Sequence, residues 1–180
     1  LSDSGAKSVR YHKETGILFV GYSNGNIDLI IGNEIFNIPD IKRKSMPGDK
    51  TIYNIRFIDN FAYLACGFGI VELNLDRKEI RNTFYIGDLG SNVKVNDIAY
   101  DGEFLYAASD NGIYKGRLTD FLVDFANWEI ITDINSGAFS WMKESSFNNI
   151  VSVNNMLITN YYNPEQAITD SILVFDGSNW

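Results

Sequence analysis

The chain has 180 residues, 45% of them hydrophobic and 14% aromatic, which allows a sizeable core and excludes a disordered protein. Its formal net charge of −8 disfavours non-specific binding to nucleic acid or to an anionic membrane, and no apolar run approaches the roughly 20 residues that cross a bilayer. The single cysteine, Cys66, excludes an internal disulfide and any multi-cysteine metal site.

Short strands joined by tight turns follow a polar entry loop at residues 1–5, which has nothing to pack against. Alternating apolar residues predict four strands, at 8–12, 17–22, 26–31 and 34–37. Ser23-Asn24-Gly25 provides the positive-φ residues that a hairpin turn needs. Pro39 cannot donate to a strand ladder and ends the last strand. Together they predict a blade over residues 6–38.

The same plan returns twice. A polar linker at residues 42–50 contains Pro47 and Gly48, so it is predicted to be a surface loop. A second blade, residues 51–87, has predicted strands at 54–58, 61–66, 69–74 and 80–85. A third, residues 93–133, has predicted strands at 95–100, 104–109, 112–117 and 128–132, with an Asp101-Gly102 hairpin.

A fourth unit, residues 147–180, is longer than the others. Its first strand starts near Asn148 and turns at Asn154-Asn155, and two further strands are predicted at 156–160 and 171–175. The additional residues form two predicted excursions, at 138–147 and 161–170. The chain stops at Trp180, where an outer strand is expected to begin.

The repeat length identifies the fold class. Ile27, Ile70 and Ile113 each follow a hairpin turn and recur at intervals of 43 residues, which is the period of a propeller blade. We therefore predict an all-β fragment of a β-propeller, with about 3.5–4 consecutive four-stranded antiparallel blades of a ring of about seven. Residues 1–180 are expected to be part of a single propeller domain truncated at both ends, because an incomplete ring leaves apolar blade faces uncovered. A closed four-bladed ring is the alternative, but its last blade would lack an outer strand.

Several runs along the chain resemble the amino-terminal propeller of PorZ-type proteins of the Bacteroidetes type IX secretion system. They are Leu1–Gly5, Tyr11–Thr15, Val20–Ile30, Gly48–Ile52, Ala62–Leu64, Gly67–Val71, Ala107-Ala108, Asp110–Tyr114 and Asp124–Trp128. Propellers of two-component sensors share the short hairpins but usually carry tryptophan in the second strand of each blade. Here Phe19, Leu64 and Tyr106 stand there, which favours the PorZ-type family.

The resemblance implies a non-enzymatic component that is cell-surface, outer-membrane-associated or periplasmic. It implies partners among secretion-system proteins, such as a sortase-like protease, or an anionic lipopolysaccharide, with no nucleic acid and no direct membrane insertion. The alternatives are the periplasmic ligand-sensing propeller of a hybrid two-component regulator and, with less support, a lyase or hydrolase built on a propeller. A carboxy-terminal secretion domain, a transmembrane helix with a kinase, or clustered histidines elsewhere in the parent gene would separate the three.

No residue pattern predicts catalysis, a metal or a cofactor. His12, the only histidine, lacks a partner nucleophile and is expected at the surface or at a strand end. Cys66 is expected to be an inert buried thiol. Gly67-Phe68-Gly69 and Asp110-Asn111-Gly112 are interpreted as hairpin turns, because neither continues as a phosphate loop or a calcium loop.

Two groups of residues are candidates for ligand binding. The first is a basic loop formed by Lys42, Arg43, Lys44 and Lys50, which either keeps the linker soluble or contacts an anionic polysaccharide or acidic partner. The second consists of aromatic residues on the predicted excursions, which either pack between blades or stack on a sugar or protein partner. These residues are Phe139, Trp141, Tyr161 and Tyr162.

Overall fold

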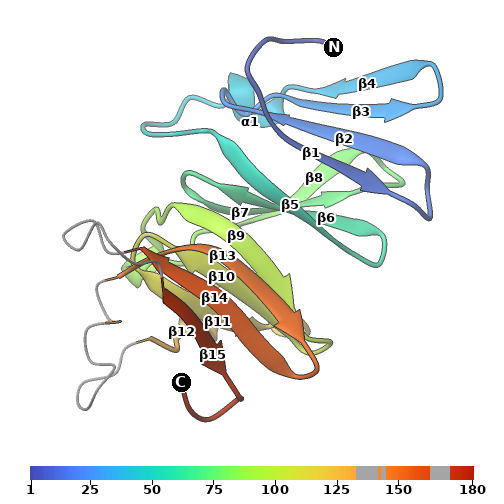
Figure 1. The fold of residues 1–180 in the computed structure, drawn as a ribbon. Coiled ribbons are helices and arrows are strands. Elements are labelled where there is room, and N and C mark those ends of the chain that lie inside the picture. Colours follow the sequence, from blue (N-terminus) through green and yellow to red (C-terminus); the bar gives the residue numbers. More distant parts are fainter. Residues whose placement is uncertain (133–141, 143–144, 163–170) are drawn as a thin grey trace.

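The computed structural model describes residues 1–132, 142, 145–162 and 171–180. These residues form three four-stranded antiparallel sheets and one three-stranded sheet, and each sheet is a meander of consecutive strands (Figure 1). Blade 1 contains β1 (Ala6–His12), β2 (Ile17–Tyr22), β3 (Ile27–Ile31) and β4 (Glu34–Ile38). Blade 2 contains β5 (Ile52–Ile58), β6 (Phe61–Cys66), β7 (Gly69–Asn74) and β8 (Glu79–Phe84). Blade 3 contains β9 (Val95–Tyr100), β10 (Phe104–Ser109), β11 (Gly112–Arg117) and β12 (Trp128–Ile130). Blade 4 contains β13 (Ser146–Val153), β14 (Met156–Tyr162) and β15 (Ser171–Phe175).

The first strand of each blade packs beside the first strand of the next: β1 lies against β5, β5 against β9, and β9 against β13. The blades therefore share an inner row of strands and spread outward from it as an open arc, with the two termini at opposite ends (Figure 1). This arrangement confirms the predicted all-β fold of consecutive antiparallel blades.

Alternation along each strand builds the core, because successive side chains point to opposite blade faces. In β6, Leu64 and Cys66 belong to the buried cluster between blades 1 and 2, whereas Tyr63 and Ala65 belong to the cluster between blades 2 and 3. A third cluster around Phe147 fills the space between blades 3 and 4.

All four inner strands change register near their first residues. The shift separates Ala6 from Ser8 in β1, Ile52 from Asn54 in β5, Val95 from Asp97 in β9, and Phe147 from Ile150 in β13. Such a β-bulge turns the local backbone and redirects a side chain. The repeated position shows that the bulge is part of the blade plan, and the sequence pattern did not predict it.

The residue after the bulge links one blade to the next. Ser8 Oγ donates to the Ile52 carbonyl at 2.9 Å, and Asn54 Nδ2 donates to Asp97 Oδ1 at 2.6 Å. Asp97 Oδ2 in turn accepts the backbone N–H of Ile150 at 3.0 Å. These bonds join all four inner strands and hold the blades at fixed relative positions. Burial raises the pKa of the Asp97 carboxyl.

Three details of the sequence prediction need correction. The linker after Pro39 begins with a one-turn helix, α1 (Asp40–Arg43), because Ile41 turns inward and is buried in the first core cluster. The entry loop is not free: the Ser2 N–H donates to Asp28 Oδ2 at 2.7 Å. The second predicted excursion starts too early, because both Tyr161 and Tyr162 lie within β14.

Candidate binding surfaces

The basic loop follows β4 and includes the helix α1. Lys42 Nζ pairs with Asp3 Oδ2 at 2.5 Å. Lys50 Nζ donates to the carbonyl oxygens of Lys42 at 2.9 Å and Lys44 at 2.6 Å, which fixes the carboxyl end of the helix. Lys44 Nζ donates to the Tyr85 hydroxyl at 3.2 Å. Three of the four predicted cations thus already have partners within the fold.

The remaining cation of the loop is different. Arg43 is exposed, and within the described part of the chain no hydrogen bond or ion pair engages its guanidinium. The ion pair with Lys42 also affects Asp3. The hydrogen bond from Lys42, with a second from Asn24, lowers the pKa of Asp3 to about 2. The free positive charge of this loop is therefore centred on Arg43.

Further cations gather beside the basic loop around Tyr53, the bulge residue of β5. Lys7 Nζ lies 5.8 Å and Lys94 Nζ 5.0 Å from the centre of the Tyr53 ring, within reach of cation–π attraction. The Tyr53 hydroxyl donates to Asp49 Oδ2 at 2.6 Å, and Lys94 pairs with Asp110 at 3.2 Å. Burial, followed by the nearby Asp49, raises the pKa of Tyr53 to about 12. We call Lys7, Arg43, Lys44, Tyr53 and Lys94 the linker rim.

Sequence reasoning missed three of the five residues of the linker rim, namely Lys7, Tyr53 and Lys94. Lys7 and Lys94 are isolated basic residues in the sequence, and they meet at Tyr53 because they stand near the beginnings of β1 and β9, the inner strands on either side of β5. The available signal was their spacing of roughly two blade periods.

The predicted aromatic surface is only partly visible. Phe139 and Trp141 lie outside the described residues. Tyr161 is half-buried in β14, where its ring centre lies 6.1 Å from that of Phe147, and Tyr162 pairs with Ser146 across the sheet. Figure 1 shows β14 and α1 in opposite parts of the arc, so these tyrosines do not join the basic loop. Their part in ligand binding stays a prediction.

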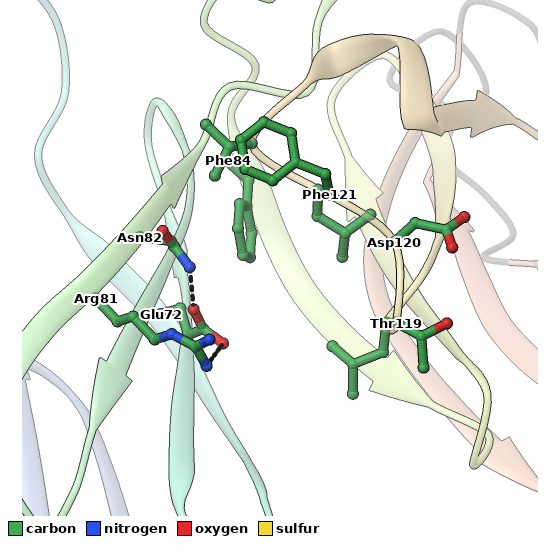
Figure 2. Close-up of a pocket in the computed structure, with 10 residues that line it drawn as sticks. Glu72, Arg81, Asn82, Phe84, Thr119, Asp120 and Phe121 are labelled. Atoms are coloured by element: carbon green, nitrogen blue, oxygen red, sulfur yellow. Dashed lines mark hydrogen bonds and ion pairs between the residues drawn. The ribbon is translucent and has the colours of Figure 1, made fainter.

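A pocket of about 340 Å³ lies between blades 2 and 3. Figure 2 shows Glu72, Arg81 and Asn82 on one wall and residues of the β11–β12 loop on the other. Glu72 is buried, and it accepts the Tyr63 hydroxyl at 2.9 Å and Asn82 Nδ2 at 2.6 Å, with the Arg81 guanidinium 3.7 Å away. Burial and the Glu72 charge raise the pKa of Tyr63.

The loop on the second wall, residues 118–127, is anchored from within. Leu122 is buried in the cluster between blades 2 and 3. Trp128 Nε1 donates to the Leu122 carbonyl at 3.0 Å, and Asn127 Nδ2 donates to the Phe121 carbonyl at 2.9 Å. The loop ends in a short 3-10 helix, η2 (Phe125–Asn127). The Ala126 N–H of this helix donates to Asp124 Oδ1 at 3.0 Å.

The residues considered for chemistry occupy structural positions. His12 ends β1 as predicted but is buried rather than exposed, with Nδ1 2.8 Å from Thr15 Oγ1 and its ring packed on Phe57. Cys66 is buried as predicted, and burial raises the pKa of its thiol. Among the described residues no cluster of three or more histidine, cysteine or acidic side chains is placed to hold a metal ion. The described part of the chain also contains no helix long and apolar enough to cross a membrane.

An open arc of antiparallel blades joined through their inner strands defines a β-propeller protein. The chain belongs to the family of amino-terminal β-propeller domains of PorZ, a type IX secretion protein, whose family model matches residues 1–129. A comparison with curated proteins gives no match.

Solved structures show the same fold. PorZ of Porphyromonas gingivalis, described as an essential bacterial surface component of the type IX secretion system, superposes with a TM-score of 0.72 at 25% identity. The match covers 96% of this chain and 22% of PorZ, so the chain spans about a fifth of that protein. The extracellular domain of a hybrid two-component system from B. thetaiotaomicron gives a TM-score of 0.66 at 17% identity, covering 91% of this chain and 20% of the other. The β-propeller domain of Cps50 (Swd1) from Myceliophthora thermophila gives 0.62 at 15% identity, covering 96% and 54%. The last two likenesses show the fold alone.

Proposed function

We propose that this chain is a rigid, non-catalytic docking module of a type IX secretion component at the bacterial cell surface. Its linker rim binds either a partner protein of the secretion system, such as the sortase-like protease that the family resemblance implies, or an anionic polysaccharide. The observation that carries the proposal is that Lys7 and Lys94 converge on Tyr53, whose hydroxyl bonds to Asp49 of the linker that also carries Arg43, in an otherwise acidic chain.

The arrangement of the linker rim supports an electrostatic role. Its cations come from different blades, and the bonds through Ser8, Asn54 and Asp97 keep those blades from moving apart. A ligand with several negative charges therefore meets cations that are already positioned, which lowers the entropy lost on binding.

Family membership supports the cellular setting. PorZ of P. gingivalis is a surface component of its secretion system, and we extend that location to the protein that contains this chain. The hybrid two-component alternative has only the shared fold in its favour, so we do not propose it.

Binding of purified protein to lipopolysaccharide with and without anionic polysaccharide, and to purified secretion-system proteins, tests the proposal. Arg43→Ala combined with Lys94→Ala should weaken binding about tenfold, because each removes a positive charge from the rim. The matched control is Lys13→Ala combined with Arg77→Ala, which removes two exposed charges outside the rim. The proposal fails if both double variants lose affinity equally, or if the rim variant binds like the wild type.

A further inference from the structure

Four apolar side chains are exposed together where blades 2 and 3 meet. Leu89 is 89% exposed, Phe121 71%, Val123 42% and Phe125 38%. Leu89 lies in the short 3-10 helix η1 (Asp88–Gly90), which packs against η2. Phe121 and Val123 also line the pocket beside them (Figure 2). We call these four residues the apolar ridge.

The fold holds the apolar ridge in place instead of burying it. Leu122 and Trp128 anchor the loop from below, so Phe121 and Val123 on either side of Leu122 must point outward. Leu89 adopts a φ of 55°, in the left-handed region that is unfavourable for a branched side chain. Exposed leucine in a strained backbone gains nothing from folding, and such positions are typical of binding sites.

The ridge carries negative charge with no internal compensation. Asp88, Asp120 and Asp124 are exposed beside it, and no ion pair engages them within residues 1–132, 142, 145–162 and 171–180. Arg81, Arg117 and Lys115 line pockets together with Asp120. All three have other partners: Arg81 lies beside Glu72, Arg117 pairs with Glu103, and Lys115 Nζ lies 4.1 Å from the centre of the Phe104 ring. A matching surface therefore needs apolar side chains together with lysine or arginine.

We propose that the apolar ridge is a second docking surface, for a protein segment in which apolar residues are flanked by lysine or arginine. This inference rests on the proposed docking function and adds a second site, which carries negative charge where the linker rim carries positive charge. Apolar side chains of the partner cover Leu89, Phe121 and Phe125, and one side chain enters the pocket of about 340 Å³ beside Glu72. Anionic polysaccharide and anionic membrane are disfavoured, because the three carboxylates repel them. A ridge-to-ridge pair of two copies would place the same carboxylates against each other.

Site-specific photo-crosslinking in the full-length protein tests the proposal in cells of its own bacterium. Benzoylphenylalanine replaces Phe121 and, as the matched control, Arg77 on the exposed β7–β8 turn of blade 2. The expected product forms at position 121 alone, and mass spectrometry maps it to a protein segment with apolar residues next to lysine or arginine. The proposal is overturned by no product above the control level, or by a crosslink to lipopolysaccharide, to a second copy of this chain, or to a segment without basic residues.

A synthetic peptide of the mapped segment then gives the affinity. Phe121→Ser and Leu89→Ser should each weaken peptide binding about tenfold, and Asp120→Asn combined with Asp124→Asn should weaken it and reduce its salt dependence. Arg77→Ala should leave both the peptide affinity and its salt dependence unchanged. Thermal unfolding of every variant checks folding, because all these side chains are exposed. Unchanged binding in Phe121→Ser overturns the ridge proposal, whereas loss confined to the rim variants leaves the proposed function intact.

Discussion

The basic loop and the apolar ridge lie on the same frame of blades but use their side chains in opposite ways. In the loop, Lys42 and Lys50 are engaged by Asp3 and by backbone carbonyls, so much of the charge stabilises the loop itself. In the ridge, Phe121 and Leu89 are exposed although their neighbours are anchored. A residue's type alone therefore does not show whether it is available to a partner. What matters is whether the fold has already satisfied it.

Loss of the hydrogen bonds that join the inner strands should affect the basic loop and the apolar ridge together. Asp97→Ala leaves Asn54 Nδ2 and the backbone N–H groups of Ile98 and Ile150 without their acceptor. We expect a loss of about 3 kcal/mol in the free energy of unfolding, because orphaned buried donors each cost about 1–3 kcal/mol and loss of the carboxylate's own burial cost offsets part of this. Urea denaturation measures it, and a loss below about 1 kcal/mol would contradict the role given to Asp97.

The same variant should also change the pH dependence of stability. Burial raises the pKa of Asp97 above its unfolded value of about 4, so the folded state binds its proton more tightly than the unfolded state does. The stability that this group contributes is present at low pH and falls as pH rises through the interval between the two pKa values. The free energy of unfolding of the wild type should therefore exceed that of Asp97→Ala by a smaller amount as the pH rises from 4 toward neutrality. A difference that grows with pH would reverse the sign.

Within the ridge loop, anchor and ridge residues should separate cleanly. Leu122→Ala should lower the free energy of unfolding by about 2 kcal/mol, because it leaves a cavity between blades 2 and 3. Phe121→Ala, one residue away and exposed, should change stability by less than about 0.5 kcal/mol. Chemical denaturation of the two variants side by side gives both values. Equal losses would show that Phe121 supports the fold and is not free for a partner.

A smaller contrast is expected in the basic loop. Lys50→Ala should lower the free energy of unfolding by about 1 kcal/mol, because Lys50 Nζ caps the carbonyls at the end of α1. Arg43→Ala, which removes an exposed guanidinium, should leave stability unchanged. Thermal unfolding at matched ionic strength compares them. If Arg43→Ala is the more damaging change, the assignment of the free charge to Arg43 is wrong.

The smallest effect is expected at Leu89. Leu89→Gly should raise stability by about 0.5 kcal/mol, because glycine adopts a φ of 55° without strain and its greater freedom in the unfolded chain offsets part of the gain. Leu89→Ala keeps the positive φ with a Cβ and serves as the control. Denaturation midpoints of the two variants measure this difference. A midpoint for Leu89→Gly at or below that of Leu89→Ala would show that the backbone at Leu89 is not strained.

Much of the strand pattern was predictable because its causes are local. Seven strands begin and end where alternation and turn residues predicted, namely β2, β6, β7, β9, β10, β11 and β15. The basic loop was also visible, since its residues are neighbours in the chain. The one-turn helix after Pro39 was missed because burial of Ile41, a tertiary contact, decides it.

The amino-acid sequence by itself determined the repeat and most of the strands, because a period of two and a period of 43 are properties of the residue order. The resemblance to the PorZ-type family rested on particular runs of residues and not on either period. Tertiary structure alone decided which polar side chains link blades, which lysines are occupied, and that Leu89 and Phe121 share one surface. Apart from the local bonds of Lys50, those pairings join residues tens of positions apart, and packing within and between neighbouring blades brings them together.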